Sequence, residues 1–148
     1  MIELRVERTI AAAPERVFDW LADPTSLKAA PLVLGARLAK GSSELKAGAV
    51  RVVTGTGMWF EEEYTAYDPP RSFSYLILRS VPGFVHEGGT LTFTPQGEGT
   101  HVDWVTKYTH PLWSGGKAFE TVSSRLLRWS FLAVLDGCAK AGVIARRT

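Results

Sequence analysis

Residues 117–143, with the sequence KAFETVSSRLLRWSFLAVLDGCAKAGV, form the longest stretch of the chain that has a helical pattern. They follow two glycines and precede only five further residues. At 3.6 residues per turn, one apolar face results. It comprises Phe119, Val122, Leu126, Trp129, Ala133, Gly137, Ala141 and Ile144, with Leu127 and Val134 at its edge. The stretch therefore predicts one long C-terminal helix that buries this face.

The residues before this helix alternate in the manner of antiparallel strands. Ile2, Leu4 and Val6 start a first strand, and six more strands are expected at 33–38, 49–54, 59–67, 72–79, 89–94 and 100–110. A short helix is expected from Pro14 to Asp23, with a further turn after it. One apolar helix and a run of strands can bury their faces only against each other. We therefore predict an α+β fold, a curved antiparallel sheet of about seven strands wrapped around the C-terminal helix.

Length and composition limit the functional classes. The 148 residues suit one domain with a substantial core, here the whole range 1–148. The net charge of +2, with both signs interspersed, argues against a nucleic-acid partner. The single cysteine, Cys138, is consistent with a reducing, cytoplasmic compartment. The most apolar run, 126–135, is too short to cross a membrane and contains Arg128.

Three motifs carry a resemblance to a known superfamily. They are 12–23 (AAPERVFDWLAD), Glu62-Glu63-Tyr64 followed by Asp68-Pro69-Pro70-Arg71, and 99–104 (GTHVDW). With them, the chain resembles the helix-grip fold of the START and birch-pollen-allergen superfamily (SRPBCC). Within that superfamily it is most similar to the bacterial polyketide cyclase/dehydrase and lipid transport family. The resemblance implies a cavity between the sheet and the long helix, and it implies either ligand carriage or cyclase-type chemistry there.

Period-two alternation nominates the residues that line such a cavity. We expect inward side chains on four strands and on the long helix, and we take them as ligand-binding candidates. They are Phe60, Tyr64, Tyr75, Leu91, Phe93, Trp104, Thr106, Phe119, Leu126 and Trp129. Tyr64 and Tyr75 are equally well explained as plain core aromatics.

Glu62 is the first of three candidate catalytic residues. If Phe60 and Tyr64 point inward, Glu62 does too, and it could act as a general base or hold a polar head group. Two structural alternatives stay open. Glu62 could belong to a solvated acidic stretch with its neighbours, or it could pair with Arg51 on the adjacent strand.

Tyr108 and His110 are the other two candidates, because they share one face near the end of the last strand. They could donate hydrogen bonds to a ligand carbonyl or move a proton. The alternative for His110 is an ordinary loop histidine before Pro111. The three histidines are scattered and the cysteine is single, so no metal site and no cofactor are expected.

Three functions remain from the sequence. The first is binding of an apolar, lipid- or polyketide-like small molecule. The second is a metal-free polyketide cyclase, aromatase or dehydratase that uses the same cavity. The third is a structural or partner-binding domain with a filled core. Leu132 and Leu135, beside Phe131, suggest a homodimer contact.

Overall fold

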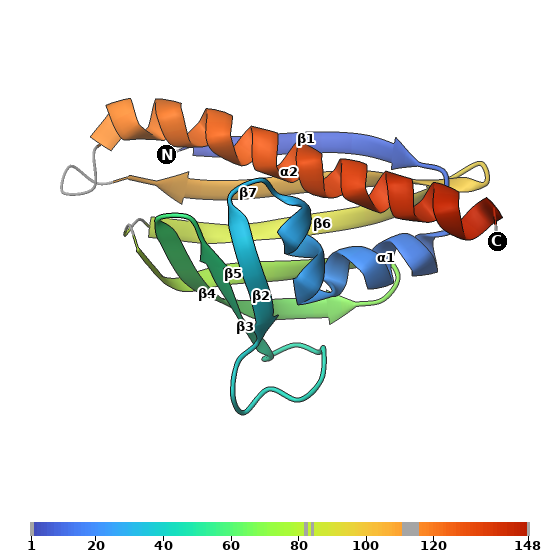
Figure 1. Cartoon of the computed structure of the whole chain (residues 1–148), viewed down its shortest axis with the longest axis horizontal. Coiled ribbons are helices and arrows are strands. Elements are labelled where there is room, and N and C mark those ends of the chain that lie inside the picture. Colours follow the sequence, from blue (N-terminus) through green and yellow to red (C-terminus); the bar gives the residue numbers. More distant parts are fainter. Residues whose placement is uncertain (1, 82, 84, 111–115, 148) are drawn as a thin grey trace.

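A seven-stranded antiparallel sheet, in the order β1-β7-β6-β5-β4-β3-β2, curves around one long helix (Figure 1). This computed structural model describes residues 2–81, 83, 85–110 and 116–147, with side chains up to 142. The elements are β1 (Ile2–Ile10), α1 (Pro14–Ala22), η1 (Pro24–Ala29), β2 (Val33–Leu38), β3 (Val50–Gly55), β4 (Met58–Asp68), β5 (Ser72–Val81), β6 (Val85–Gln96), β7 (Gly99–Thr109) and α2 (Gly116–Arg147). The predicted helix-grip fold is confirmed.

The helix α1 closes one end of the sheet. Pro14 occupies its first turn, where a backbone N–H would have no partner within the helix, so its absence costs no hydrogen bond. Asp23 follows the last helical residue, and its side chain accepts a hydrogen bond from the Thr25 amide at 2.9 Å. Its apolar stripe points at the sheet, and Phe18 lies edge-on to Phe73 and Phe93 at 5.6 and 5.2 Å. These aromatic contacts fill the space between α1 and the sheet, so this end is solid core.

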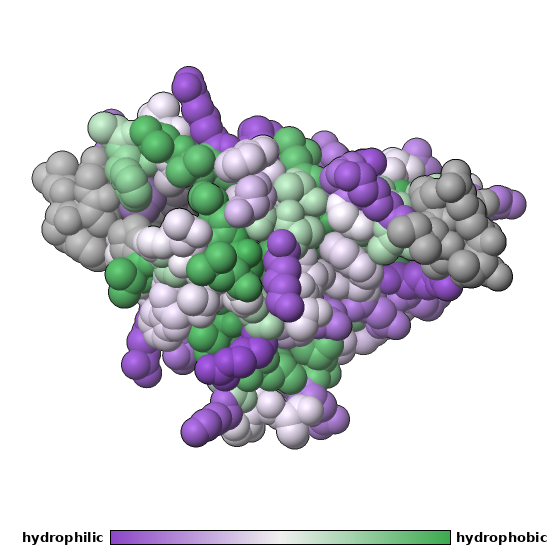
Figure 2. All heavy atoms as spheres, in the orientation of Figure 1, coloured by the Kyte–Doolittle hydropathy of each residue, from purple (hydrophilic) through white to green (hydrophobic). Residues whose placement is uncertain are grey.

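The face that α2 presents to the sheet differs from the predicted one. Val122 and Trp129 are both 53% exposed, so the prediction that these two side chains are buried is wrong, whereas Leu126 is 43% exposed and also lines the cavity under the helix. Apolar surface over the first half of α2 is visible in Figure 2. Leu135 is fully buried, so its predicted place in a homodimer contact beside Leu132 is wrong. The inward face is instead formed by Glu120, Ser123, Leu127, Ser130, Phe131, Val134, Leu135 and Cys138.

Polar residues on the inward face of α2 explain why the wrong face of this helix was predicted to be buried. Three of the inward residues in the first half of α2 are Glu120, Ser123 and Ser130. A search for apolar periodicity passes over such a face and selects the apolar stripe on the other side of the helix. In the second half of α2 the inward residues are apolar or small. A Cβ on Gly137 would lie only 3.0 Å from the Ala29 side chain, which shows how closely η1 approaches the helix there.

The sheet opens between β5 and β6. These strands pair only from Ser72, opposite Thr92, to Tyr75, opposite Gly89. In contrast, β6 stays paired with β7 as far as Val85, opposite Thr109. Beyond Tyr75, the side chain of His86 takes over the connection between the two strands. The sheet therefore separates over the half that lies away from α1, and this separation leaves room for a cavity.

Candidate functional site

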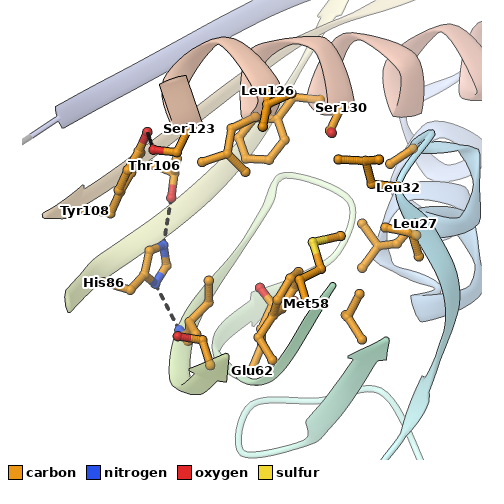
Figure 3. Close-up of a pocket in the computed structure, with 18 of the residues that line it drawn as sticks. Leu27, Leu32, Met58, Glu62, His86, Thr106, Tyr108, Ser123, Leu126 and Ser130 are labelled. Carbon is orange, nitrogen blue, oxygen red and sulfur yellow. Dashed lines mark hydrogen bonds between the residues drawn. The ribbon is translucent and has the colours of Figure 1, made fainter. Parts of the chain in front are cut away.

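A cavity of about 280 Å³ lies between the sheet and the first half of α2. Its apolar walls come from η1 and the chain after it, from β3 to β5, from β7 and from α2. The apolar lining residues are Leu27, Ala30, Leu32, Val33, Val53, Met58, Phe60, Ile77, Val81, Trp104, Phe119, Leu126, Leu127, Phe131 and Val134. Figure 3 shows the leucines of η1 and its following turn on one side and a group of polar side chains on the other.

The first polar group joins β7 to α2 through the hydroxyl of Ser123. That hydroxyl donates to the Glu120 carbonyl at 3.2 Å, so its oxygen can accept from Tyr108 Oη at 3.0 Å and from His110 Nε2 at 3.1 Å. The Glu120 carboxylate accepts from the His110 backbone N–H at 3.1 Å. Burial raises the pKa of Tyr108 and lowers the pKa of His110, which favours the neutral form of both side chains.

The second polar group is His86, which bridges the opening in the sheet. Its Nδ1 accepts from the Ile77 backbone N–H at 2.9 Å, and its Nε2 lies 2.7 Å from the Thr106 hydroxyl (Figure 3). Because Nδ1 accepts, the proton of the neutral ring must be on Nε2, which donates to Thr106. Burial lowers the pKa of His86 to about 4. Protonation of Nδ1 would also remove the bond from Ile77.

This arrangement predicts a loss of stability in acid. The folded pKa of about 4 lies below the ordinary histidine value near 6.5, so the unfolded chain binds the proton more readily. The contribution of neutral His86 to the free energy of unfolding is complete above about pH 6.5 and falls as the pH drops toward 4. Because the side chain is partly exposed, we expect the free energy of unfolding to fall by about 2 kcal/mol. Urea unfolding of the wild type and of His86→Gln across this range would measure the loss. If the free energy of unfolding of the two proteins changed with pH in the same way, the loss could not be assigned to His86.

An ion pair forms the floor of the cavity. Arg51 on β3 and Glu62 on β4 are opposite each other in the register, and Arg51 Nε and Nη2 donate to the two Glu62 carboxylate oxygens at 3.0 and 3.4 Å. Both side chains are about 3% exposed. Burial, the largest single effect, would lower the pKa of Arg51, but the Glu62 carboxylate together with Tyr64 and Tyr75 outweighs it and holds that pKa above its ordinary value. Of the alternatives considered for Glu62, the ion pair is the one present.

Two aromatic rings flank this ion pair. The guanidinium carbon of Arg51 lies 5.1 Å from the centre of the Tyr64 ring and 5.3 Å from that of Tyr75, both within cation–π range. Trp104 Nε1 donates to Tyr75 Oη at 2.9 Å, and burial raises the pKa of Tyr75 to about 12. A Cβ at Gly89 would overlap the Tyr75 ring, so the glycine allows this ring to lie flat on β6.

The predicted site residues are divided between cavity, core and surface. Nine of them line the cavity: Phe60, Glu62, Tyr75, Trp104, Thr106, Tyr108, His110, Phe119 and Leu126. Three others lie in the core beside it: Tyr64, which donates to the Ala22 carbonyl, and Leu91 and Phe93. Trp129 is on the outer face of α2, so its predicted inward position is wrong. The cavity is also lined by three residues that were not predicted from the sequence, His86, Ser123 and Ser130.

Several other expectations can be compared with the structure. Residues 82, 84 and 111–115 lie outside the described residues. The described residues contain no group of three potential metal ligands. None of the helices in the described ranges has the length and apolar character that crossing a bilayer requires. Cys138 is 3% exposed and belongs to the core, and this burial raises the pKa of its thiol to about 12.

Solved structures with the same architecture span nearly the whole chain. A protein of Thermus thermophilus, TTHA0849, superposes with a TM-score of 0.74 at 24% identity, over 97% of this chain and 99% of its own. Major latex-like protein 151 of Panax ginseng gives 0.71 at 16%, over 95% and 97%. Ara h 8.0201 gives 0.67 at 13%, over 93% and 97%. At these identities the likeness shows the fold alone.

Sequence comparison gives the family. No curated protein matches this sequence significantly. The model of the family described as "Polyketide cyclase / dehydrase and lipid transport" matches residues 1–142, which include every element that lines the cavity. The chain therefore belongs to the polyketide cyclase/dehydrase and lipid transport family.

Proposed function

We propose that this protein binds one apolar small molecule, lipid- or polyketide-like, in the cavity under α2. The observation that carries the proposal is the cavity itself, about 280 Å³ in volume, with mostly apolar walls and a few polar groups at one side. Ligand sites in proteins commonly have this composition. Membership of a family described by cyclase, dehydrase and lipid transport activities supports a hydrophobic ligand.

The position of the polar groups bears on how the ligand is oriented. Tyr108, Ser123 and His110 form one linked group where β7 ends and α2 begins. The side opposite in Figure 3 is lined by Leu27 and Leu32. An amphipathic molecule would place its hydrogen-bonding group at the first side and its hydrocarbon at the second, because an unpaired polar group is expensive to bury.

Titration with anilinonaphthalene sulfonate, a fluorescent apolar probe, tests the proposal. We expect saturable binding of one probe per chain, with the emission shifted to the blue. The probe should be displaced by a long-chain fatty acid, which competes for the same walls. Absence of saturable binding, or a probe that fatty acid leaves in place at every concentration, would contradict the proposal.

A second function is supported by the Tyr108–Ser123–His110 group, since these side chains face the same cavity. Acid–base chemistry on a bound poly-carbonyl chain, of the cyclase, aromatase or dehydratase type, needs groups that donate and accept protons at fixed positions. Both carboxylate oxygens of Glu62 accept hydrogen bonds from Arg51, so this alternative relies on His110 more than on Glu62.

For the enzyme alternative we predict that His110→Gln abolishes conversion of a poly-β-ketone thioester while it preserves probe binding. Mass spectrometry of the products measures conversion, and the fluorescence titration measures binding. Equal conversion by the variant and the wild type would exclude His110 from the chemistry.

A further inference from the structure

The outer face of α2 carries a continuous apolar stripe. Val122, Leu126, Trp129 and Leu132 are spaced three or four residues apart and are between 43% and 53% exposed. In Figure 2 the hydrophobic surface gathers over the first half of α2 and continues below it toward β2. Single exposed apolar side chains are common, but four on one helix face form a patch, and patches of this kind mark binding surfaces.

In this half of α2, polar residues occur among apolar ones on the inward face, while the outward face carries an apolar stripe. The side that faces the cavity contains Glu120, Ser123 and Ser130, whereas the side that faces away contains the stripe. A helix that only covered the sheet would carry the opposite distribution. Two of these polar residues have partners at the end of β7: Ser123 lies within hydrogen-bond distance of Tyr108 and His110, and the Glu120 carboxylate accepts from the His110 N–H. Within the part of the chain that the structure describes, the outward apolar residues have no such explanation, and we therefore look for a partner outside it.

The charges beside the stripe indicate the partner. Lys117, Arg125 and Arg128 on α2 are exposed, and Arg128 reaches back to the Arg5 carbonyl at 3.2 Å. The one acidic residue in the sequence between 117 and 135 is Glu120, which is 6% exposed and accepts from the His110 N–H. The outer face of this half of the helix therefore presents apolar side chains and positive charge.

A second copy of the chain is a poor partner for such a surface. In a twofold interface the same patch meets itself, so each copy would bring its own lysine and arginines against those of the other. Close like charges oppose association. A helix with tryptophan and leucine on one face and lysine or arginine beside them is instead suited to the surface of a bilayer that contains anionic lipid.

We propose that the stripe of Val122, Leu126, Trp129 and Leu132 docks α2 on a membrane surface rich in anionic lipid. Leu126 connects this surface to the cavity, since the same side chain lines the cavity and is 43% exposed. Docking would bring the edge of the cavity against the bilayer. The docking does not depend on the identity of the ligand and can be tested without one.

Flotation with vesicles of phosphatidylcholine, with and without phosphatidylglycerol, tests the proposal on the full chain. We expect binding to the anionic vesicles, weaker binding at high salt and little binding to phosphatidylcholine alone. Val122→Ser with Trp129→Ser should abolish binding. Lys117→Gln with Arg125→Gln should weaken it by about fivefold for each cation removed.

Matched controls separate docking from general adsorption of a basic protein. Lys46→Gln with Lys107→Gln removes the same charge from the chain between β2 and β3 and from β7, and Leu34→Ser removes an apolar side chain that is 69% exposed on β2. Both controls should bind as the wild type does. Equal losses in controls and α2 variants would overturn the proposal. So would a failure of the wild type to bind anionic vesicles, or a dimer in solution that Val122→Ser with Trp129→Ser dissociates.

Discussion

Replacing Arg51 by methionine is expected to lower the free energy of unfolding by about 3–5 kcal/mol, the usual loss when one partner of a buried ion pair is removed. Arg51 and Glu62 are each about 3% exposed, and the arginine donates to both oxygens of the carboxylate. Methionine fills much of the same space but donates no hydrogen bond. The Glu62 carboxylate would then be buried without a compensating charge.

A double variant separates this effect from a loss of packing. Arg51→Met combined with Glu62→Leu removes both charges and keeps apolar volume at both positions. Because well-packed apolar residues can replace a buried ion pair at little loss, the double variant should recover most of the stability. Urea unfolding of the three proteins measures the differences. A double variant no more stable than Arg51→Met would show that packing, and not the unpaired charge, causes the loss.

Ser130→Phe is expected to weaken binding of the anilinonaphthalene probe by at least about tenfold, which is a loss of about 1.4 kcal/mol in binding free energy. Ser130 lies on the inward face of α2 and lines the cavity beneath it (Figure 3). A phenyl ring at this position would occupy part of the 280 Å³ now open to a ligand. Because the ring enters existing space, the fold should tolerate it better than it would tolerate overpacking in the core.

Thr121→Phe is the matched control on the same helix. Thr121 is exposed and its hydroxyl donates to the Lys117 carbonyl one turn earlier. A phenyl ring there points away from the cavity, so the affinity for the probe should match that of the wild type. Equal affinities in Ser130→Phe and the wild type would place the probe somewhere other than this cavity.

The fold was predictable because local patterns and global architecture agree. The strands alternate with period two, and Pro14 and the Asp23–Pro24 pair mark the ends of α1. The face of α2 was not predictable in the same way. Glu120 and Ser123 face inward because they bond groups at the end of β7 that are close only in the folded chain, so apolar periodicity selected the other side of the helix.

The candidate site was predictable where strands alternate regularly. Glu62, Thr106 and Tyr108 follow directly from the alternation on β4 and β7. His86 was missed because its role depends on the separation of β5 from β6, which no local sequence pattern predicts. Ser123 was missed because it is a polar residue on the inward face of α2, and apolar periodicity selected the other face. Trp129 was included because a tryptophan on an apolar helix stripe is usually buried, whereas here that stripe faces outward.

The central claim is that the cavity under α2 holds one apolar ligand. The most direct test is native mass spectrometry of the wild type and Ser130→Phe after each is incubated with a total lipid extract. We predict one adduct of a few hundred daltons, about what a pocket of this size accommodates, on the wild type and little or none on the variant. No adduct on the wild type, or the same adduct on both proteins, would contradict the claim.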